Sequence, residues 1–297
     1  MRLTRKLLFA VCVTFAGILS LSSPIFAEYT ITPGHFYVSH RVYEDSGTLN
    51  MVIFDMKDDS GQPFSNGDAI INVGLYDPNQ NQVNLSPFYF KPPYEILSGS
   101  FDLGTSQWVY GPSVLLNEIG ATIFDSLLVG TYRLEVLMED GLTYLSTYEV
   151  TNLIDLPVIS SRSCQITSDS AGNIFWSWKA PPELISLSRT LGTSQRIYIS
   201  AFQGTKLMSV LFLSVPTEMS FAYFPTDLIQ ALVSKGDNFG YEIQVRTTNN
   251  NCRSYSKEIT VSSPLTTIVG VDGDINGDGK IGLEEAINAL QCVTGLR

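Results

Sequence analysis

The segment Gly240-Tyr-Glu-Ile-Gln-Val-Arg246 shows which class of fold this chain of 297 residues adopts. Its three large apolar residues, Tyr241, Ile243 and Val245, occupy alternate positions. Successive side chains of a β-strand point to opposite faces, so these three side chains share one face. A strand that is apolar on one face covers a core with that face. We therefore predict that the chain is mainly β.

The region around this segment, residues 156–264, contains a second strand pattern. Asn173-Ile-Phe-Trp-Ser-Trp-Lys-Ala-Pro-Pro182 places Trp176 and Trp178 on one face and ends in two prolines, which cannot donate a hydrogen bond to a sheet. These two segments resemble the second strand and the Tyr-bearing sixth strand of a fibronectin type III domain. The resemblance implies a β-sandwich over this region. Within it, Pro225–Ser234 is predicted to form a short helix.

The preceding region, residues 28–152, alternates short apolar segments with turn residues, which is typical of a β-sandwich. Strands are expected at Gly34–Tyr43, Thr48–Met56 and Ala69–Tyr76, and a closing hairpin at Leu127–Leu137 and Thr143–Val150. The run Gly130-x-Tyr132-x-Leu134-x-Val136 resembles a late strand of an immunoglobulin-like domain, with Tyr132 as its tyrosine-corner residue. We therefore expect two tandem β-sandwiches, divided near Leu153–Pro157.

The segment Pro87–Gly111 is rich in aromatic residues, including Trp108, and contains the pair Pro92-Pro93. Aromatic side chains on irregular backbone could form a binding surface for sugars or peptides. They could instead cap the sandwich core beneath a long loop, and we favour this second interpretation.

The first 27 residues have the pattern of a secretory signal peptide: Arg2, Arg5 and Lys6, an apolar stretch over 7–21, and small residues before Ala27. The alternative is a membrane anchor, but the apolar stretch is short and is followed by Pro24. No other stretch is long and apolar enough to span a bilayer, so the mature chain is expected to have no membrane span. We predict a secreted or cell-surface protein.

The chain is acidic, with 18 Lys and Arg against 29 Asp and Glu and a formal net charge of −11. Cleavage after Ala27 would remove three basic residues and no acidic ones, making the mature chain more acidic still. An acidic surface disfavours binding to nucleic acids and to anionic membranes. A protein or a glycan at the cell surface is the kind of partner that we expect.

Three cysteines follow the predicted signal peptide: Cys164, Cys252 and Cys292. Export permits disulfides, and the first two lie in one predicted domain, so we predict a Cys164–Cys252 disulfide. The fibronectin resemblance would place both near one pole of the sandwich. Cys292 is then left over, either buried or available for an intermolecular bridge.

The C-terminal segment Asp274-Ile-Asn-Gly-Asp-Gly-Lys-Ile-Gly-Leu-Glu-Glu285 has the spacing of an EF-hand calcium loop. It places Asp274, Asn276 and Asp278 at positions 1, 3 and 5, Lys280 at position 7 as a carbonyl ligand, and Glu285 at position 12. Only this register ends on a bidentate carboxylate, because a start at Asp272 would put Leu283 there. We predict that the loop binds Ca²⁺; Mg²⁺ is less favoured, and the alternative is an acidic linker.

An apolar stripe at helical spacing follows the loop, formed by Leu283, Ala286, Ile287, Leu290 and Val293. Residues 272–297 therefore resemble half of a dockerin module, or a single dockerin-like EF-hand tail of a secreted bacterial protein. The chain departs from a dockerin in having one loop and in having Glu285 at position 12, where dockerins usually have Asp. Docking of a cohesin-like partner is thus one alternative function.

No motif for nucleophilic, zinc or phosphate chemistry is present, and the only two histidines, His35 and His40, fall in one predicted strand. The sequence therefore predicts an exported, non-catalytic, calcium-binding β-sandwich protein that acts as a binding or structural module. A dockerin-type assembly subunit and a carbohydrate-binding module are the alternatives.

Overall fold

The computed structural model describes residues 29–32, 34–262 and 268–269, and most of them lie in β-strands, which confirms the mainly β prediction. The predicted signal peptide, the calcium loop with Asp274, Asn276, Asp278, Lys280 and Glu285, and Cys292 all lie outside the described residues.

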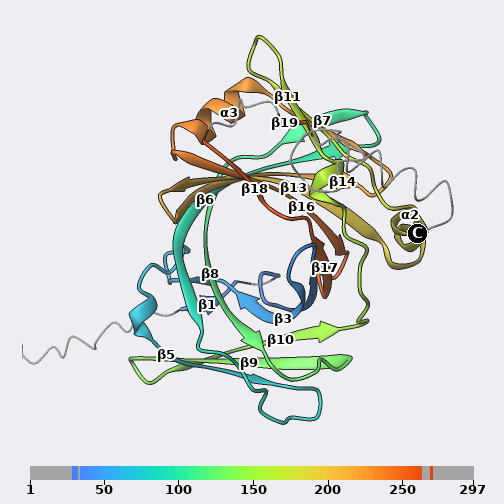
Figure 1. The fold of residues 1–297 in the computed structure, drawn as a ribbon. Helices are drawn as coiled ribbons and strands as arrows, with labels where there is room; N and C mark the ends of the chain where they lie inside the picture. Colours follow the sequence, from blue (N-terminus) through green and yellow to red (C-terminus); the bar gives the residue numbers. More distant parts are fainter. Residues whose placement is uncertain (1–28, 33, 263–267, 270–297) are drawn as a thin grey trace, which may run out of the picture.

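The central feature is a sheet that closes on itself (Figure 1). Its strands are β2 (Tyr37–Tyr43), β3 (Gly47–Phe54), β6 (Tyr89–Asp102), β8 (Val114–Ile123), β13 (Thr193–Gln203), β14 (Lys206–Pro216), β16 (Asn238–Thr247) and β17 (Cys252–Tyr255). They pair in the order β13-β14-β6-β8-β3-β2-β17-β16, and β16 pairs again with β13. We call these eight strands the closed sheet.

The closed sheet takes four strands from each predicted domain, so the two domains share one sheet. Two parallel pairings join them: β14 with β6, over Ser209–Ser214 and Glu95–Ser100, and β17 with β2, over Cys252–Tyr255 and His40–Tyr43. The other pairings around the ring are antiparallel. The expected tandem arrangement of two separate sandwiches is therefore replaced by two sandwich-like halves with a common sheet.

Two smaller sheets cover the outside of the closed sheet, on opposite sides (Figure 1). One contains β10 (Thr143–Val150), β9 (Gly130–Met138) and β5 (Ile70–Tyr76). The other contains β15 (Phe221–Phe224), β12 (Ile174–Ser177), β11 (Gln165–Ser168) and β19 (Ile268–Val269). Each encloses one apolar core against the outward face of the closed sheet, as in a sandwich.

The residues singled out in the sequence lie in these cores. In the core of the second half, Trp176 is buried and meets the ring of Tyr241 edge to face, with 5.3 Å between centroids. In the core of the first half, Tyr132 is buried and its hydroxyl accepts a hydrogen bond from the backbone N–H of Leu128 at 2.8 Å. This contact ties the side chain to backbone a few residues upstream, as a tyrosine corner does.

Two helices lie in the second half. The predicted helix is present as α3 (Thr226–Val233). The other, α2 (Pro182–Leu191), was not predicted; it begins with Pro182 at its first turn and ends at Gly192, whose φ of 62° is left-handed. Proline at the start and glycine just past the end are favoured helix boundaries. Short elements complete the fold: β1 (Thr30–Ile31), β4 (Met56–Lys57), β7 (Gln107–Tyr110), β18 (Ile259–Val261) and 3-10 turns at Gly67–Ala69 and Ser161–Ser163.

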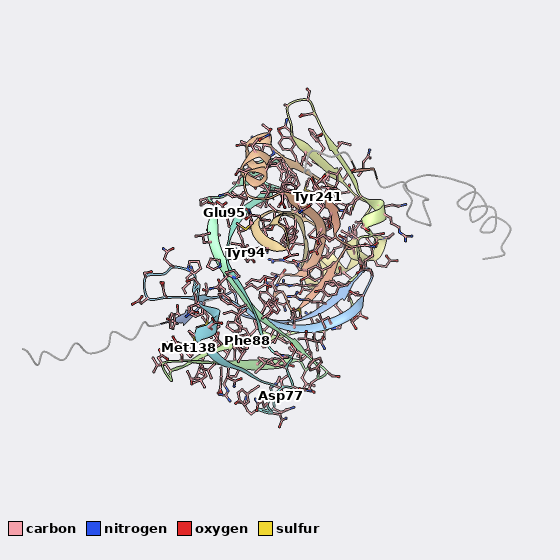
Figure 2. The ribbon with its side chains drawn as sticks, turned by 60° about the vertical axis from the view of Figure 1, so that its left-hand side comes forward. Asp77, Phe88, Tyr94, Glu95, Met138 and Tyr241 are labelled. Atoms are coloured by element: carbon pink, nitrogen blue, oxygen red, sulfur yellow. The ribbon has the colours of Figure 1, made fainter. Side chains whose placement is uncertain are left out.

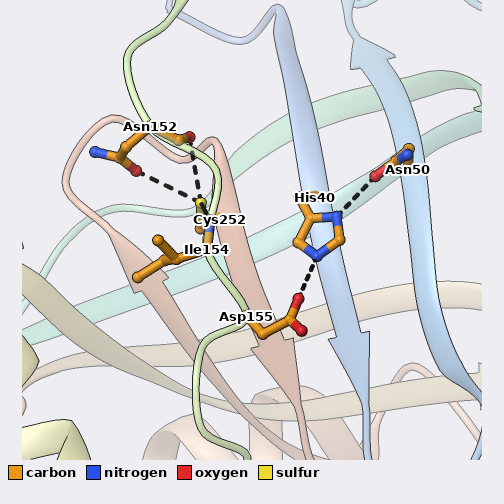
Figure 3. A network of polar contacts seen from close by, with 6 residues as sticks. All are labelled: His40, Asn50, Asn152, Ile154, Asp155 and Cys252. Atoms are coloured by element: carbon orange, nitrogen blue, oxygen red, sulfur yellow. Dashed lines mark hydrogen bonds and ion pairs between the residues drawn. The ribbon is translucent and has the colours of Figure 1, made fainter. Parts of the chain in front are cut away.

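The predicted Cys164–Cys252 disulfide is absent: both cysteines are free and buried. Cys252 begins β17 in the closed sheet, and its sulfur accepts the N–H of Ile154 at 3.3 Å and donates to the carbonyl of Asn152 at 3.4 Å (Figure 3). Cys164 precedes β11 in an outer sheet and donates to the carbonyl of Ser160. The pairing was inferred from a domain with its own two sheets, and the shared sheet places the two thiols among different partners.

Candidate functional site: a polar cavity inside the closed sheet

The closed sheet surrounds a cavity of about 610 Å³, lined by side chains from all eight of its strands. β16 illustrates how this arises. Tyr241, Ile243 and Val245 point outward into an apolar core, as their alternation predicted, and the intervening Glu242, Gln244 and Arg246 line the cavity. The strand pattern of period two thus separates a core-forming face from a polar inner face.

The same alternation holds in β6, which contributes residues to both halves. Tyr94 lines the cavity, whereas the carboxylate of the next residue, Glu95, pairs with Lys235 at 3.1 Å (Figure 2). The register against β8 shifts between Lys91 and Tyr94, where Pro92-Pro93 lie. Prolines cannot donate a ladder hydrogen bond, so a bulge at this pair is expected.

The cavity is open to solvent. Several of its lining residues are also exposed: His35 and Lys91, whose side chains are 44% and 45% exposed, together with Val114 and Glu258. Its volume lies within the range of about 300–1,000 Å³ that is usual for small-molecule sites. A small ligand would therefore fit and could enter.

Four arginines form a row along one wall of the cavity, on the consecutive strands β2, β17, β16 and β13. Arg253 on β17 is in register with Arg41 on β2 and with Arg246 on β16. Arg196 on β13 pairs with Gln244, two residues from Arg246. In-register neighbours on one face of a sheet lie about 5 Å apart at Cβ, so these charges are close together. We call these four residues the arginine row.

The arginine row is held mainly by aromatic rings and hydroxyl groups. The Arg253 guanidinium lies 4.0 Å from the ring centroid of Tyr37, and that of Arg196 lies 4.4 Å from the ring of Phe212. Nε of Arg41 donates to Oγ of Ser39 at 3.0 Å. Within the part of the chain that the structure describes, no member of the row forms an ion pair with a carboxylate.

Tyrosines line much of the remaining surface. Tyr43 and Tyr255 are stacked in register, with ring centroids 4.7 Å apart and an angle of 11° between the rings. The Arg41 guanidinium lies 5.5 Å from the centroid of the Tyr255 ring. Flat rings beside fixed cations supply both a stacking surface and hydrogen-bond donors.

The opposite wall contains an acid that is already paired. Lys91 on β6 forms an ion pair with Glu118 on β8 at 2.8 Å, and the hydroxyl of Tyr89 donates to the same carboxylate at 2.8 Å. A Cβ at Gly120 would lie only 2.5 Å from the Tyr89 hydroxyl oxygen, so the absence of a side chain at Gly120 leaves room for Tyr89 to reach Glu118. Burial acts to raise the pKa of Glu118, but Lys91 and Tyr89 outweigh it and the pKa lies below its usual value.

The pKa values of two further side chains that line the cavity, Glu242 and Arg246, are shifted. Burial, reinforced by Glu258, raises the pKa of Glu242 to about 8, so this side chain is largely protonated at neutral pH. Burial, reinforced by the charge of Arg196, lowers the pKa of Arg246 to about 10. The second shift comes first from burial, and the neighbouring charges of Arg196 and Arg253 add to it.

Outside the cavity, a polar network connects the closed sheet to the segment between the two halves (Figure 3). His40 on β2 contacts Oδ1 of Asn50 through Nδ1 at 2.8 Å and Oδ1 of Asp155 through Nε2 at 2.6 Å. Asn50 also donates to the carbonyl of Asp125. This histidine therefore has a positional role near the parallel β17–β2 junction, beside Cys252.

Some aromatic residues of segment 87–111 line the cavity and others pack against a core, so each of the two interpretations, binding surface and core cap, holds for part of the segment. Tyr89 and Tyr94 line the cavity. Phe90 packs against the core of the first half, and Trp108 packs against the core of the second half and against Phe101, with ring centroids 5.0 Å apart. The segment is regular strand, forming β6 and β7, so the expected long loop is absent.

Sequence reasoning did not single out the arginine row. A signal was present at Arg41 and Arg246, which lie next to apolar residues in predicted strands, as in Val245-Arg246. It indicates the face opposite the core, but it does not extend to Arg253, which lies outside the predicted strands, and it does not show that this face is enclosed.

No family model matches the chain, and no curated protein matches it. Among solved structures, the chicken CNTN1 FN1–FN3 domains match at 10% identity and a TM-score of 0.26, over 76% of this chain and 63% of that one. The BSP domain of a biofilm associated protein matches at 12% identity and a TM-score of 0.22, over 77% of this chain and 29% of that one. TM-scores at this level do not indicate a shared overall fold.

The class of protein is therefore defined by the structure itself: a mainly β protein in which two sandwich-like halves share a closed sheet around a polar cavity. No helix in the described part of the chain is long and apolar enough to cross a membrane. Within residues 29–32, 34–262 and 268–269, no group of three or more His, Cys, Asp or Glu side chains could hold a metal ion.

Proposed function

We propose that this chain is an exported, non-catalytic binding protein that holds a small ligand inside its closed sheet. The observation that carries the proposal is the solvent-accessible cavity of about 610 Å³, with polar and aromatic side chains converging from both halves. Pockets with a few fixed polar groups among rings are typical of ligand sites. The closed sheet cannot form from either half alone, so both halves are needed for binding.

Binding without catalysis fits the chemistry of the lining. The arginines and tyrosines supply donors and flat surfaces, which orient a ligand but do not attack it at neutral pH. The sequence lacks the motifs of common nucleophilic and hydrolytic sites. The N-terminal pattern of residues 1–27 supports export, so the ligand or partner would be met outside the cell, as a glycan or a surface molecule.

Calcium binding by the C-terminal loop is the second part of the proposal, and its support is the spacing of Asp274, Asn276, Asp278 and Glu285. The ion would be structural. At millimolar calcium and the weak affinity of extracellular sites, the gain in stability is about 1–2 kcal/mol. That is enough to order a loop and its following helix, but it is small beside the stability of two apolar cores.

Ligand binding is tested by filling the cavity. Ser200 on β13 lines it, so Ser200→Phe should block the cavity, whereas Thr147→Phe on the exposed face of β10 should not. Wild-type protein is screened on a glycan array and against a metabolite panel by thermal shift. Hits that bind wild type and Thr147→Phe but not Ser200→Phe support the proposal. Hits that bind all three equally, or no hits at all, contradict it.

Calcium binding is tested by titration calorimetry of the chain without residues 1–27. We expect one site per chain, lost in Asp274→Ala and in Glu285→Ala. Asp272→Ala is the matched control, because this residue lies just outside the predicted register. Heat of binding that survives Glu285→Ala and disappears in Asp272→Ala would show that the register is wrong.

A further inference from the structure

The arginine row has no counter-charge of its own. Arg41, Arg196, Arg246 and Arg253 lie on four consecutive strands, two of the neighbouring pairs are in direct register, and all line the cavity. Like charges directly opposite one another on a sheet are destabilising. Folding alone therefore gives no reason to place four of them on one wall.

Several of their donors also have no partner. Nη2 of Arg41, Nε of Arg196 and Nε of Arg246 are buried and make no hydrogen bond. Arg41 is only 7% exposed and lines the cavity, so its free N–H groups are held away from bulk solvent. A buried guanidinium donor without an acceptor is costly, which indicates that an acceptor is missing from this wall.

The acids of the cavity do not supply that acceptor. The Glu118 carboxylate is engaged by Lys91 and Tyr89. Oδ2 of Asp55 is paired with His35 at 2.9 Å; its Oδ1 is buried without a hydrogen bond and forms no ion pair with an arginine of the row. Glu242 faces the cavity beside Glu258, and the burial that raises its pKa to about 8 leaves it largely neutral at pH 7. The wall thus remains cationic inside a chain whose net charge is −11.

We propose that the arginine row is a binding site for a small organic anion with at least two acidic groups, which are carboxylate, phosphate or sulfate. The planar guanidinium group suits all three, because it donates two parallel hydrogen bonds to neighbouring oxygens. The oxygens of the ligand accept from Arg41, Arg246 and Arg253, and its ring or apolar part lies against the stacked Tyr43 and Tyr255. This inference rests on the proposed function, since it names the ligand class of the same cavity.

The test uses thermal unfolding of the chain at pH 7.5 and constant ionic strength. The probes are citrate, pyrophosphate, inorganic sulfate and glucuronate, with sodium chloride and neutral glucose as references. Citrate, with three carboxylates, and pyrophosphate, with two phosphate groups, carry at least two acidic groups, whereas glucuronate and sulfate carry one each and show whether a second is needed. We expect citrate or pyrophosphate to raise the midpoint by several degrees with a saturable dose dependence. A shift that grows without saturation is the general effect of excluded salts.

Arg246→Gln is the informative variant, because Nε of Arg246 has no hydrogen-bond partner and its guanidinium lies over no aromatic ring among the described residues. It should lose the saturable shift, and in chloride alone it should unfold at or above the wild-type midpoint, because repulsion is relieved. Arg133→Gln is the control: Arg133 lies on β9 outside the cavity and pairs with Glu135. This control should keep the full shift.

The inference is overturned if neither citrate nor pyrophosphate gives a saturable shift of the wild-type midpoint, and this measurement needs no variant. An equal shift in Arg246→Gln would overturn it too. The failure of the wider proposal looks different. If a neutral glycan binds wild type and Arg246→Gln alike but not Ser200→Phe, the cavity is a ligand site and only the anion assignment is wrong.

Discussion

The two faces of the closed sheet follow opposite rules, and β16 displays both. Its outward side chains, Tyr241, Ile243 and Val245, are buried among the apolar residues of the second half. Its inward side chains, Glu242, Gln244 and Arg246, line an open cavity. The pKa of Glu242 is raised there and that of Arg246 is lowered, and Nε of Arg246 has no hydrogen-bond partner. The difference teaches that stability resides on the outer face, whereas the inner face is available for binding and tolerates charges that folding does not need.

The largest effect should come from breaking the outer face. Ile243 is 1% exposed in the core of the second half, so Ile243→Ala removes buried methyl groups and leaves a void. We expect a loss of about 2–5 kcal/mol in the free energy of unfolding, measured by chemical denaturation. On the inner face, Gln244→Ala should cost about 1 kcal/mol, the value of its hydrogen bond with Tyr198 at 3.2 Å. Equal losses at the two positions would remove the contrast between the faces.

A smaller effect, with a pH signature, should follow from Glu242→Gln. The pKa of Glu242 is raised to about 8 from an ordinary 4.5, so the folded state holds this proton more tightly than the unfolded state. The stability that it provides is complete below about pH 4.5 and is lost as pH rises towards 8. The variant should therefore match wild type at low pH and exceed it by a margin that grows as the pH rises from about 4.5 through 8. Thermal unfolding midpoints are measured for both proteins across pH 4–9, and a constant difference between the two midpoints at every pH would contradict this prediction.

The paired wall should show the opposite pH dependence and the smallest effect. Lys91→Met removes the cation beside Glu118, whose pKa is lowered in the folded state. That lowering stabilises the protein above the ordinary pKa and is lost in acid. Lys91 is 45% exposed, so we expect a loss of only about 0.5–1 kcal/mol at pH 7, shrinking as pH falls below about 4. The measurement is the midpoint of denaturant unfolding at pH 7 and at pH 3.5. A larger loss at the lower pH would contradict the assignment.

Local features of the fold could be predicted because they depend on neighbours in the sequence. The alternation at Tyr241 to Val245 placed these residues in a core, and Pro225–Ser234 was predicted to be the helix that α3 forms. Tyr132 makes the backbone contact expected of it. The Cys164–Cys252 disulfide was wrong because it assumed that each half completes its own pair of sheets. The calcium loop remains a prediction from spacing alone.

The sequence by itself determined that the fold is mainly β and which face of a strand such as β16 is apolar, because a period of two requires no knowledge of distant partners. Only the tertiary structure decided what the polar faces do. On an isolated sandwich, the four arginines of the row would point into solvent, where their charges cost little. The parallel pairings of β14 with β6 and of β17 with β2 turn those faces towards one another. Enclosure lowers the local dielectric and brings the charges together, and this converts an ordinary solvated surface into a cationic cavity.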